Sequence, residues 1–193
     1  MTNADPLLQV AQWLQEAALK EALEPAAMSV ATVGADGRPS SRMVLLRGVD
    51  SRGLVFYTNL GSRKVADLRS NPWVALCLHW KSMARQIRVE GQAEQVGDAE
   101  ADAYFASRVR ESQIGAWASK QSQHLASRAE LEARVAKYEA NFAGHAVPRP
   151  AFWSGYRVTP TLIEFWEDRP FRLHERSEWQ REHGVWHHHR LYP

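Results

Sequence analysis

Two basic side chains follow a strand-to-helix junction in residues 59–64 (NLGSRK). We expect a helix to begin at Ser62, so that its free backbone N–H groups and the positive end of its dipole face outward beside Arg63 and Lys64. These are the features of a phosphate site, although the spacing of glycine and lysine differs from that of a Walker loop. A capped, solvated surface helix is the alternative interpretation.

Two other groups of side chains could bind an anion or a flat ligand. Tyr104, Arg108 and Ser112 are spaced by four residues, so they would share one face of a continuous helix and form a second phosphate site. Arg42 and Arg47 bracket four apolar residues whose backbone amides could lie along a flat ligand. The alternatives are an exposed helix face with an ion pair and a partly buried strand with charged ends.

Residues 172–176 (RLHER) alternate basic or titratable side chains with others. On a strand, Arg172, His174 and Arg176 would occupy one face. Such a face is typical of a site for an anionic substrate or cofactor, and His174 could exchange a proton near neutral pH. A solvent-facing edge strand is the alternative.

Three further features are interpreted as structural. The eight tryptophans are more typical of core or interface than of ligand stacking, and Trp153 and Trp166 fall in predicted strands. Residues 187–189 (HHH) are interpreted as native strand, which would divide the three rings between opposite faces. Cys77 lies in an apolar run and is predicted to be a buried, inert thiol. No metal site is expected.

Composition restricts the class of protein. The 193 residues indicate one domain, and 24 Lys+Arg against 22 Asp+Glu leave a net charge of +2, too small for general attraction to nucleic acid or an acidic membrane. A single cysteine excludes an internal disulfide and fits a reducing compartment. No apolar run is long enough to span a membrane and the first residues lack the pattern of a signal peptide, so we expect a cytoplasmic protein.

The hydrophobic pattern predicts a single α+β domain built on a barrel. Residues 1–25 form an N-terminal helix opened by Asp5 and Pro6, and residues 26–96 form the barrel core, with a short helix ending at Ser70. Residues 97–145 form a helical layer, in which Asp98 caps one helix and Ser127 caps another. Residues 150–193 return to strands. The expected strands are 28–33, 40–47, 54–58, 73–80, 86–96, 153–158, 162–166, 172–176 and 185–191.

Taken together, these segments resemble the pyridoxamine 5′-phosphate oxidase family from about residue 26 to residue 193. The motifs that carry the resemblance are 42–47 (RMVLLR), 55–64 (VFYTNLGSRK), 85–86 (RQ), 112–122 (SQIGAWASKQS), 152–155 (FWSG), 163–166 (IEFW), 172–176 (RLHER) and 190–193 (RLYP). The resemblance implies an FMN-binding split β-barrel that is homodimeric, with flavin at the subunit interface.

The resemblance also implies roles for individual residues. The flavin and its phosphate would be held by Arg42, Met43, Val44, Leu45, Leu46, Arg47, Tyr57, Thr58, Arg63, Lys64, Gln86, Gln121, Ser122, Trp166 and Arg176. The substrate would be bound by Arg47, Tyr104, Arg108, Ser112, Arg172 and His174. Arg172 and His174 would lie over the pyridine ring and form the catalytic pair.

The implied reaction oxidises pyridoxamine or pyridoxine 5′-phosphate to pyridoxal 5′-phosphate. A hydride passes from the substrate to FMN, and O₂ reoxidises the flavin to give H₂O₂. The sequence departs from the family pattern at Arg47, where lysine is usual, and at Val109, where proline is usual. The basic, tyrosine-containing arm of some members has no counterpart before Asp5. A flavin-binding or pyridoxal-phosphate-binding protein without catalysis is the main alternative, and a nucleic-acid-binding barrel, disfavoured by the net charge, is a third.

Overall fold

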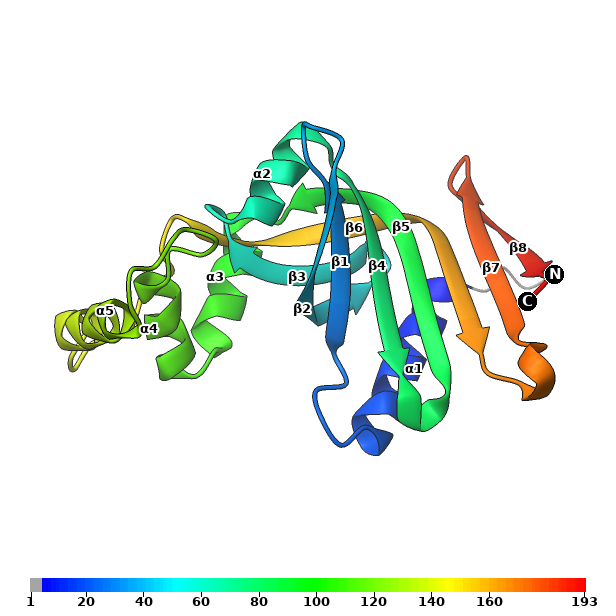
Figure 1. The fold of residues 1–193 in the computed structure, drawn as a ribbon, viewed down its shortest axis with the longest axis horizontal. Helices are drawn as coiled ribbons and strands as arrows, with labels where there is room; N and C mark the ends of the chain where they lie inside the picture. The colour runs from blue at the N-terminus through cyan, green and yellow to red at the C-terminus, as the bar shows by residue number, and fades with distance from the viewer. Residues whose placement is uncertain (1–4) are drawn as a thin grey trace.

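Six antiparallel strands form a closed barrel in the computed structural model, which describes residues 5–193 (Figure 1). The strands run in the order β3-β2-β1-β4-β5-β6, and pairing of β3 with β6 closes the barrel. Closure leaves no open sheet edge within the barrel itself. The bounds are β1 Ala27–Val33, β2 Pro39–Asp50, β3 Gly53–Asn59, β4 Trp73–Trp80, β5 Arg85–Gln95 and β6 Trp153–Glu167. The predicted barrel is confirmed.

The barrel is filled by the apolar residues that alternate along its strands. Met28 and Val30 of β1 and Leu76 and Leu78 of β4 are 0–1% exposed, as expected for side chains that point inward at every second position. Gly53 and Gly91 allow strands to approach closely, because a Cβ atom at either position would lie within about 2.3 Å of a backbone oxygen of β6. The interior is therefore packed, and any ligand must bind outside it.

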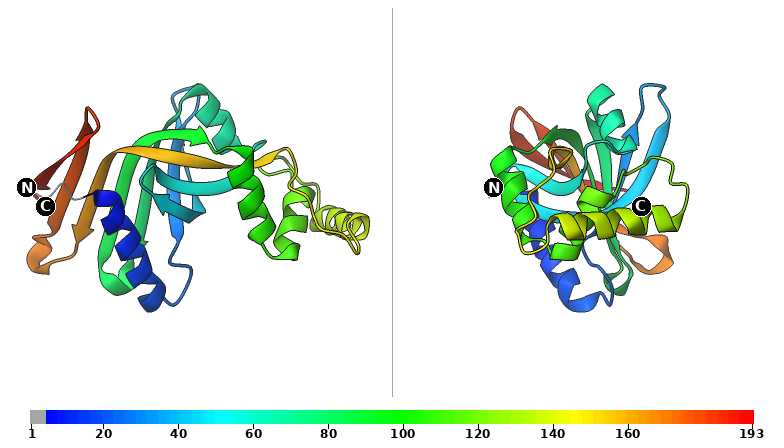
Figure 2. Two further views of the ribbon diagram at one scale, coloured as in Figure 1. Left: turned by 180° about the vertical axis from the view of Figure 1, so that it is seen from behind. Right: turned by 90° about the vertical axis from the view of Figure 1, so that its left-hand side faces the viewer.

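Helices cover the two ends of the barrel (Figures 1 and 2). Helix α1, Pro6–Lys20, is capped by the Asp5 carboxylate and packs Trp13 edge-on against Phe165 of β6, with ring centroids 5.0 Å apart. The short α2, Arg63–Ser70, follows β3. Helices α3, Asp98–Ser107, α4, Arg110–Ala118, and α5, Arg128–Asn141, extend from one end of the molecule.

The strands after residue 153 differ from the prediction. The expected strands 153–158 and 162–166 are one continuous strand, β6, which pairs with β5, β3 and β7. The expected strand 172–176 is wrong: residues 170–172 form a 3₁₀ turn, η2 Pro170–Arg172, and β7 begins only at Glu175. Phe171 and Arg172 have φ of 59° and 62°, which no strand accommodates. The hairpin β7 Glu175–Glu182 and β8 Val185–Leu191 extends the sheet away from the barrel.

Helix starts were predicted with mixed success. Ser127 accepts a hydrogen bond from the backbone of Glu130, as expected for a capping serine. The expected cap at Asp98 is wrong, because the helix already includes Asp98 and Gly97 is its N-cap. The expectation about the segment before Asp5 concerns residues 1–4, which lie outside the described part of the chain.

No helix among the described residues is long and apolar enough to cross a membrane. Residues 5–193 also hold no cluster of three or more His, Cys, Asp or Glu side chains that could bind a metal ion. Cys77 is half-buried, and burial raises the pKa of its thiol, so it is held in the unreactive protonated form.

Candidate active site

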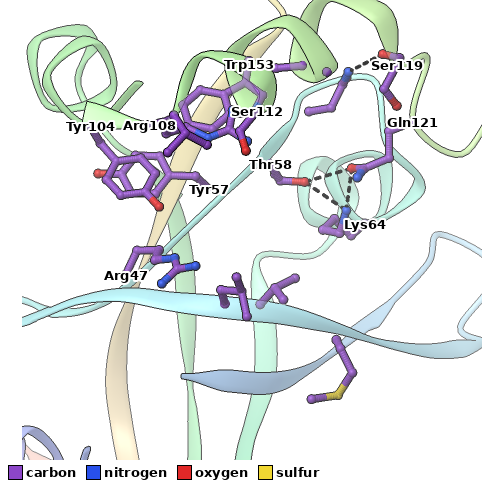
Figure 3. Close-up of a pocket in the computed structure, with 17 residues that line it drawn as sticks. Arg47, Tyr57, Thr58, Lys64, Tyr104, Arg108, Ser112, Ser119, Gln121 and Trp153 are labelled. Carbon is purple, nitrogen blue, oxygen red and sulfur yellow. Dashed lines mark hydrogen bonds between the residues drawn. The ribbon is translucent and has the colours of Figure 1, made fainter. Parts of the chain in front are cut away.

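A cavity of about 630 Å³ opens where β2 and β3 meet α2, α3 and α4 (Figure 3). It collects predicted site residues from separate parts of the sequence. Those that line it are Met43, Val44, Leu45, Arg47, Tyr57, Thr58, Lys64, Tyr104, Arg108, Ser112 and Gln121. The cavity has two cationic poles, one at Lys64 and one at Arg47 and Arg108, on opposite sides in Figure 3.

Lys64 forms the first pole. Its side chain is buried, with 6% exposed. Its ammonium donates to Thr58 Oγ1 and Gln121 Oε1, both at 2.9 Å, and to Ser62 Oγ at 3.2 Å. These partners are neutral, and the described residues hold no ion pair to Lys64. A buried cation with only neutral partners fits a site that takes up an anion.

The protonation of Lys64 is sensitive to its surroundings. Burial, with a smaller contribution from the positive charge of Arg42, lowers the pKa of Lys64 to about 8. A bound phosphate would oppose both effects, because an anion favours the charged ammonium. Anion binding and protonation at this pole are therefore coupled.

The loop that carries Lys64 is fixed by its own side chains. Asn59 accepts a hydrogen bond from the backbone N–H of Gly61 at 2.8 Å and donates to the backbone oxygen of Ser119 at 3.2 Å. The backbone N–H of Arg63 donates to Ser122 Oγ at 3.2 Å. Sequence reasoning missed the role of Asn59, although an asparagine before a glycine at a strand end is typical of such a turn.

Aromatic rings and two arginines form the second pole. Tyr57 and Tyr104 are stacked with centroids 3.8 Å apart and planes 9° apart, and Trp153 lies parallel to Tyr57 at 5.4 Å. The Arg108 guanidinium lies over the Trp153 ring at 4.9 Å. Burial raises the pKa of the Tyr57 hydroxyl, which therefore stays a neutral hydrogen-bonding group.

Arg108 has an unused donor. Its Nη1 atom is buried and has no hydrogen-bond partner among the described residues. Burial lowers the pKa of Arg108, and the positive charge of Arg47 lowers it further. An unpaired, buried guanidinium nitrogen is costly, and an anion in the cavity would supply its acceptor.

A helix break brings Tyr104, Arg108 and Ser112 together. The predicted continuous helix is wrong, because α3 ends at Ser107 and α4 begins at Arg110. All three side chains still line the cavity, since the chain turns at Arg108 and Val109. Val109 has φ of −59° and ψ of 144°, a conformation that proline also adopts, so the break is compatible with either residue at this position.

Several predicted residues lie near the cavity without lining it. Arg42 donates to the backbone oxygen of Val30 and to Thr32 Oγ1, and its guanidinium lies 3.6 Å from the carboxylate of Asp67. Leu46 is 2% exposed and belongs to the barrel core. Arg63 and Ser122 are exposed at the N-terminus of α2.

The remaining predicted residues form a second group at the C-terminal end of the sheet. Gln86, Trp166 and Arg176 are direct neighbours across β5, β6 and β7. His174 packs against Trp166 with ring centroids 4.7 Å apart. Arg172 lies in the 3₁₀ turn and is exposed. We call Gln86, Trp166, Arg172, His174 and Arg176 the C-terminal group.

A second cavity of about 360 Å³ adjoins this group and is lined by His174 and Arg176. Its lining shares no residue with that of the larger cavity. Arg176 is held by Glu164, which is 2% exposed and accepts from Arg176 Nε at 2.7 Å and from Arg88 Nη1 at 2.8 Å. Sequence reasoning missed Glu164, because only the register of β5, β6 and β7 brings it between two arginines.

The fold and the two groups define a class: an antiparallel barrel with an external cavity lined by cationic side chains and a C-terminal extension. Comparisons with known proteins identify the family. Residues 14–142 match the model described as "Pyridoxamine 5′-phosphate oxidase", and residues 153–193 match "Pyridoxine 5′-phosphate oxidase C-terminal dimerisation region". The chain belongs to the pyridoxamine 5′-phosphate oxidase family, and the resemblance seen in the sequence is confirmed.

Individual relatives agree with this assignment. A pyridoxine/pyridoxamine 5′-phosphate oxidase of Rhodospirillum rubrum is 56% identical and covers 100% of this chain and 98% of its own length. One of Myxococcus xanthus is 55% identical and covers 100% and 94%. Among solved structures, PhzG from Burkholderia lata, in complex with tetrahydrophenazine-1-carboxylic acid, has a TM-score of 0.93 at 34% identity and covers 100% of this chain and 94% of its own. An FMN-binding protein from Nostoc punctiforme has a TM-score of 0.80 at 16% identity, with complete coverage of both chains, and shares the fold.

Proposed function

We propose that this protein uses FMN to oxidise pyridoxamine 5′-phosphate and pyridoxine 5′-phosphate to pyridoxal 5′-phosphate. The observation that carries the proposal is the pair of cationic poles in one cavity, at Lys64 and at Arg47 with Arg108. Each pole suits one phosphate, and the proposed reaction brings together two phosphorylated molecules. The relatives that are about 55% identical over the whole chain carry the name of this activity.

FMN fits the residues of the first pole. A phosphate beside Lys64 would give the buried ammonium the counter-charge that its neutral partners lack. Thr58 and Gln121 would complete the contacts, and Met43, Val44 and Leu45 of β2 would offer backbone groups along a flat ring system. Bound FMN would accept the two electrons of the oxidation and pass them to O₂, which leaves as H₂O₂.

The second pole suits the substrate phosphate. Arg108 Nη1, which has no partner among the described residues, would donate to a phosphate oxygen, and Arg47, Tyr104 and Ser112 line the same part of the cavity. Fixing the phosphate orients the rest of a small substrate, which is how binding energy lowers the entropic barrier to reaction. The guanidinium of Arg47 can bind a phosphate through two parallel hydrogen bonds.

We also propose that two chains share each site, with FMN at their interface. Figure 1 has α3 and α4, beside the larger cavity, and β7, beside the C-terminal group, at opposite ends of the molecule. The catalytic pair Arg172 and His174 belongs to the C-terminal group, within the region that matches the dimerisation model. In a two-fold dimer, the C-terminal group of one protomer would complete the cavity of its partner.

The first experiment separates oxidation from binding alone. Purified protein loaded with FMN is mixed anaerobically with each phosphorylated substrate, and the flavin absorbance is followed. We expect bleaching with both substrates, recovery when O₂ is admitted, and formation of pyridoxal 5′-phosphate. Retained flavin without bleaching would favour the non-catalytic binding protein instead.

The second experiment tests the shared site by mixing two variants. Lys64→Met removes the first pole, and His174→Ala removes a residue of the C-terminal group. The assay uses an FMN concentration that loads the wild type but leaves Lys64→Met empty. After subunit exchange, the mixture should regain about a quarter of wild-type activity, because half of the dimers are mixed and each of these keeps one intact site of two. A mixture that stays as inactive as its two components would contradict an interface site.

A further inference from the structure

His174 is constrained from two sides. Its ring packs against Trp166, and its Nδ1 atom lies 2.9 Å from Oδ1 of Asp168. The His174 side chain is 17% exposed, whereas that of Asp168 is 54% exposed. The carboxylate therefore reaches a mostly covered ring from a solvent-facing turn.

The contact with Asp168 selects one tautomer of the ring. The contact is an ion-pair contact and not a directional hydrogen bond. Without a hydrogen on Nδ1, the ring would present a lone pair to a carboxylate oxygen 2.9 Å away, so the negative charge of Asp168 favours a hydrogen on Nδ1. The backbone N–H of Arg169 also approaches Nδ1, but at 3.4 Å, and it would require the opposite tautomer. The shorter contact to an ionised acceptor is the stronger one, so Nδ1 carries the hydrogen and Nε2 does not.

The local charges leave Asp168 available for this contact. Arg169, the nearest cation in the turn, pairs with Glu175 at 3.0 Å and with Glu167 at 3.7 Å. The backbone N–H of Asp168 donates to the backbone oxygen of Ala84 at 2.9 Å, which anchors the residue independently of its side chain. Removing the carboxylate should therefore leave the turn in place.

We propose that Asp168 is a positioning residue that holds the Nδ1–H tautomer of His174 and leaves Nε2 free to take up a proton. The proposal rests on the proposed oxidation, in which the amino or hydroxyl group of the substrate loses a proton while the adjacent carbon gives up a hydride to FMN. The alcohol then becomes the aldehyde directly, and the amine becomes an imine that water hydrolyses with release of ammonia. That proton moves to Nε2, Nδ1 keeps its own, and the imidazolium so formed faces the Asp168 carboxylate. The same division of roles between a carboxylate and a histidine is known from hydrolases.

The test compares Asp168→Ala with a control in the same turn, Glu175→Gln. Glu175 pairs with Arg169, so its variant removes an equal charge without touching His174. Steady-state kinetics of the FMN-loaded dimer give kcat and KM, and absorbance gives the flavin content. In parallel, ¹⁵N NMR of histidine-labelled protein identifies which ring nitrogen of His174 carries hydrogen, with the signal assigned by its loss in His174→Gln.

For Asp168→Ala we expect kcat to fall about tenfold, less than the roughly 100-fold that loss of the proton acceptor itself would cause, with KM and flavin content unchanged. The NMR signal should move from the Nδ1–H to the Nε2–H tautomer, because the Arg169 N–H then becomes the main partner of Nδ1. Glu175→Gln should change neither quantity. An unchanged tautomer, or an equal loss of kcat in the control, would overturn the proposal.

Failure of the proposed function would look different. If wild-type protein did not oxidise either substrate, the oxidation would be wrong, while the NMR comparison would still decide whether Asp168 sets the tautomer of His174.

Discussion

The larger cavity and the C-terminal group hold their functional side chains in contrasting ways. Around the cavity, Lys64 is buried and its ammonium has three hydrogen-bond partners in the same chain. In the C-terminal group, Arg172 is exposed in a turn where two consecutive residues other than glycine have positive φ. Each such residue costs about 1–2 kcal/mol, so the C-terminal group carries backbone strain at two consecutive residues, whereas the loops beside Lys64 have one such residue, Ser122.

This difference indicates a division of labour. A site that binds a cofactor gains from groups that are fixed before the ligand arrives, because no ordering cost remains. Strained backbone persists where neighbouring contacts hold it, and it is often found at functional sites. We therefore expect substitutions around Lys64 to change cofactor affinity, and substitutions of the catalytic pair Arg172 and His174 in the C-terminal group to change turnover.

The largest effect is expected from His174→Ala. Loss of a group that takes up a proton lowers a rate by about 100-fold or more, so kcat should fall by that factor. Flavin content should remain near one per chain, because the residues of the Lys64 pole are intact. Stopped-flow bleaching of the flavin measures the rate directly. A comparable loss of bound FMN in His174→Ala would contradict the expectation that this residue affects turnover and not cofactor binding.

The second prediction concerns the cavity. Lys64→Met removes a charged donor at about 1.5–3 kcal/mol per hydrogen bond, so FMN affinity should fall about 10- to 100-fold. The melting temperature of the FMN-free protein should not fall, because the buried ammonium is itself disfavoured by burial, as its lowered pKa indicates. Fluorescence titration with FMN and thermal melts test both parts.

Lys81→Met is the matched control for this substitution, since Lys81 is exposed in a 3₁₀ turn. It should leave FMN affinity unchanged. If Lys64→Met bound FMN as tightly as Lys81→Met, the proposal that Lys64 binds the FMN phosphate would be wrong.

The Lys64 pole was predictable because its cause is local. A strand end, an Asn-x-Gly turn and a helix start lie within six consecutive residues of the sequence. Burial of the ammonium was not predictable, because it depends on Gln121, which is brought from 57 positions away. The barrel was predictable from alternation and turn signals, while its closure by β3 and β6 depends on register between distant segments.

The errors have particular physical causes. Residues 172–176 alternate as a strand does, but Pro170 and the positive φ of Phe171 and Arg172 impose a turn. Tyr104, Arg108 and Ser112 were grouped correctly through a helix that does not exist as one piece. Periodicity shows which residues could share a face, and it does not show where the backbone breaks.

The third prediction is a pH dependence at the cavity. In the free protein Lys64 has a pKa of about 8, so it is charged below that pH and loses its proton above it. A bound phosphate raises the pKa of Lys64, so above pH 8 FMN binding is accompanied by uptake of a proton at Lys64. FMN affinity should therefore fall as pH rises through 8, by at most about tenfold per pH unit for one proton. Lys64→Met should lack this decline, and a wild-type affinity that stays constant from pH 7 to 9.5 would contradict the coupling.

The smallest effect is expected at the break between α3 and α4. Val109 is 66% exposed with φ of −59°, and Arg108 before it has φ of −74° and ψ of 148°, so both fit a proline at position 109. Val109→Pro should raise the free energy of unfolding by about 0.4–1 kcal/mol, because it restricts the unfolded chain. Because the substitution keeps the backbone angles at Arg108 and Val109, the cavity should keep its shape, and kcat and the substrate KM should change by no more than about twofold. A twofold change is smaller than the one that 1 kcal/mol of binding or activation free energy would cause.

Denaturant titration of the wild type, Val109→Pro and the control Val109→Ala measures the stability. A proline variant that is more stable but turns over more slowly would contradict this expectation, because it would show that turnover requires motion at the break between α3 and α4. The conformation of the C-terminal group would then not be the only one that affects turnover.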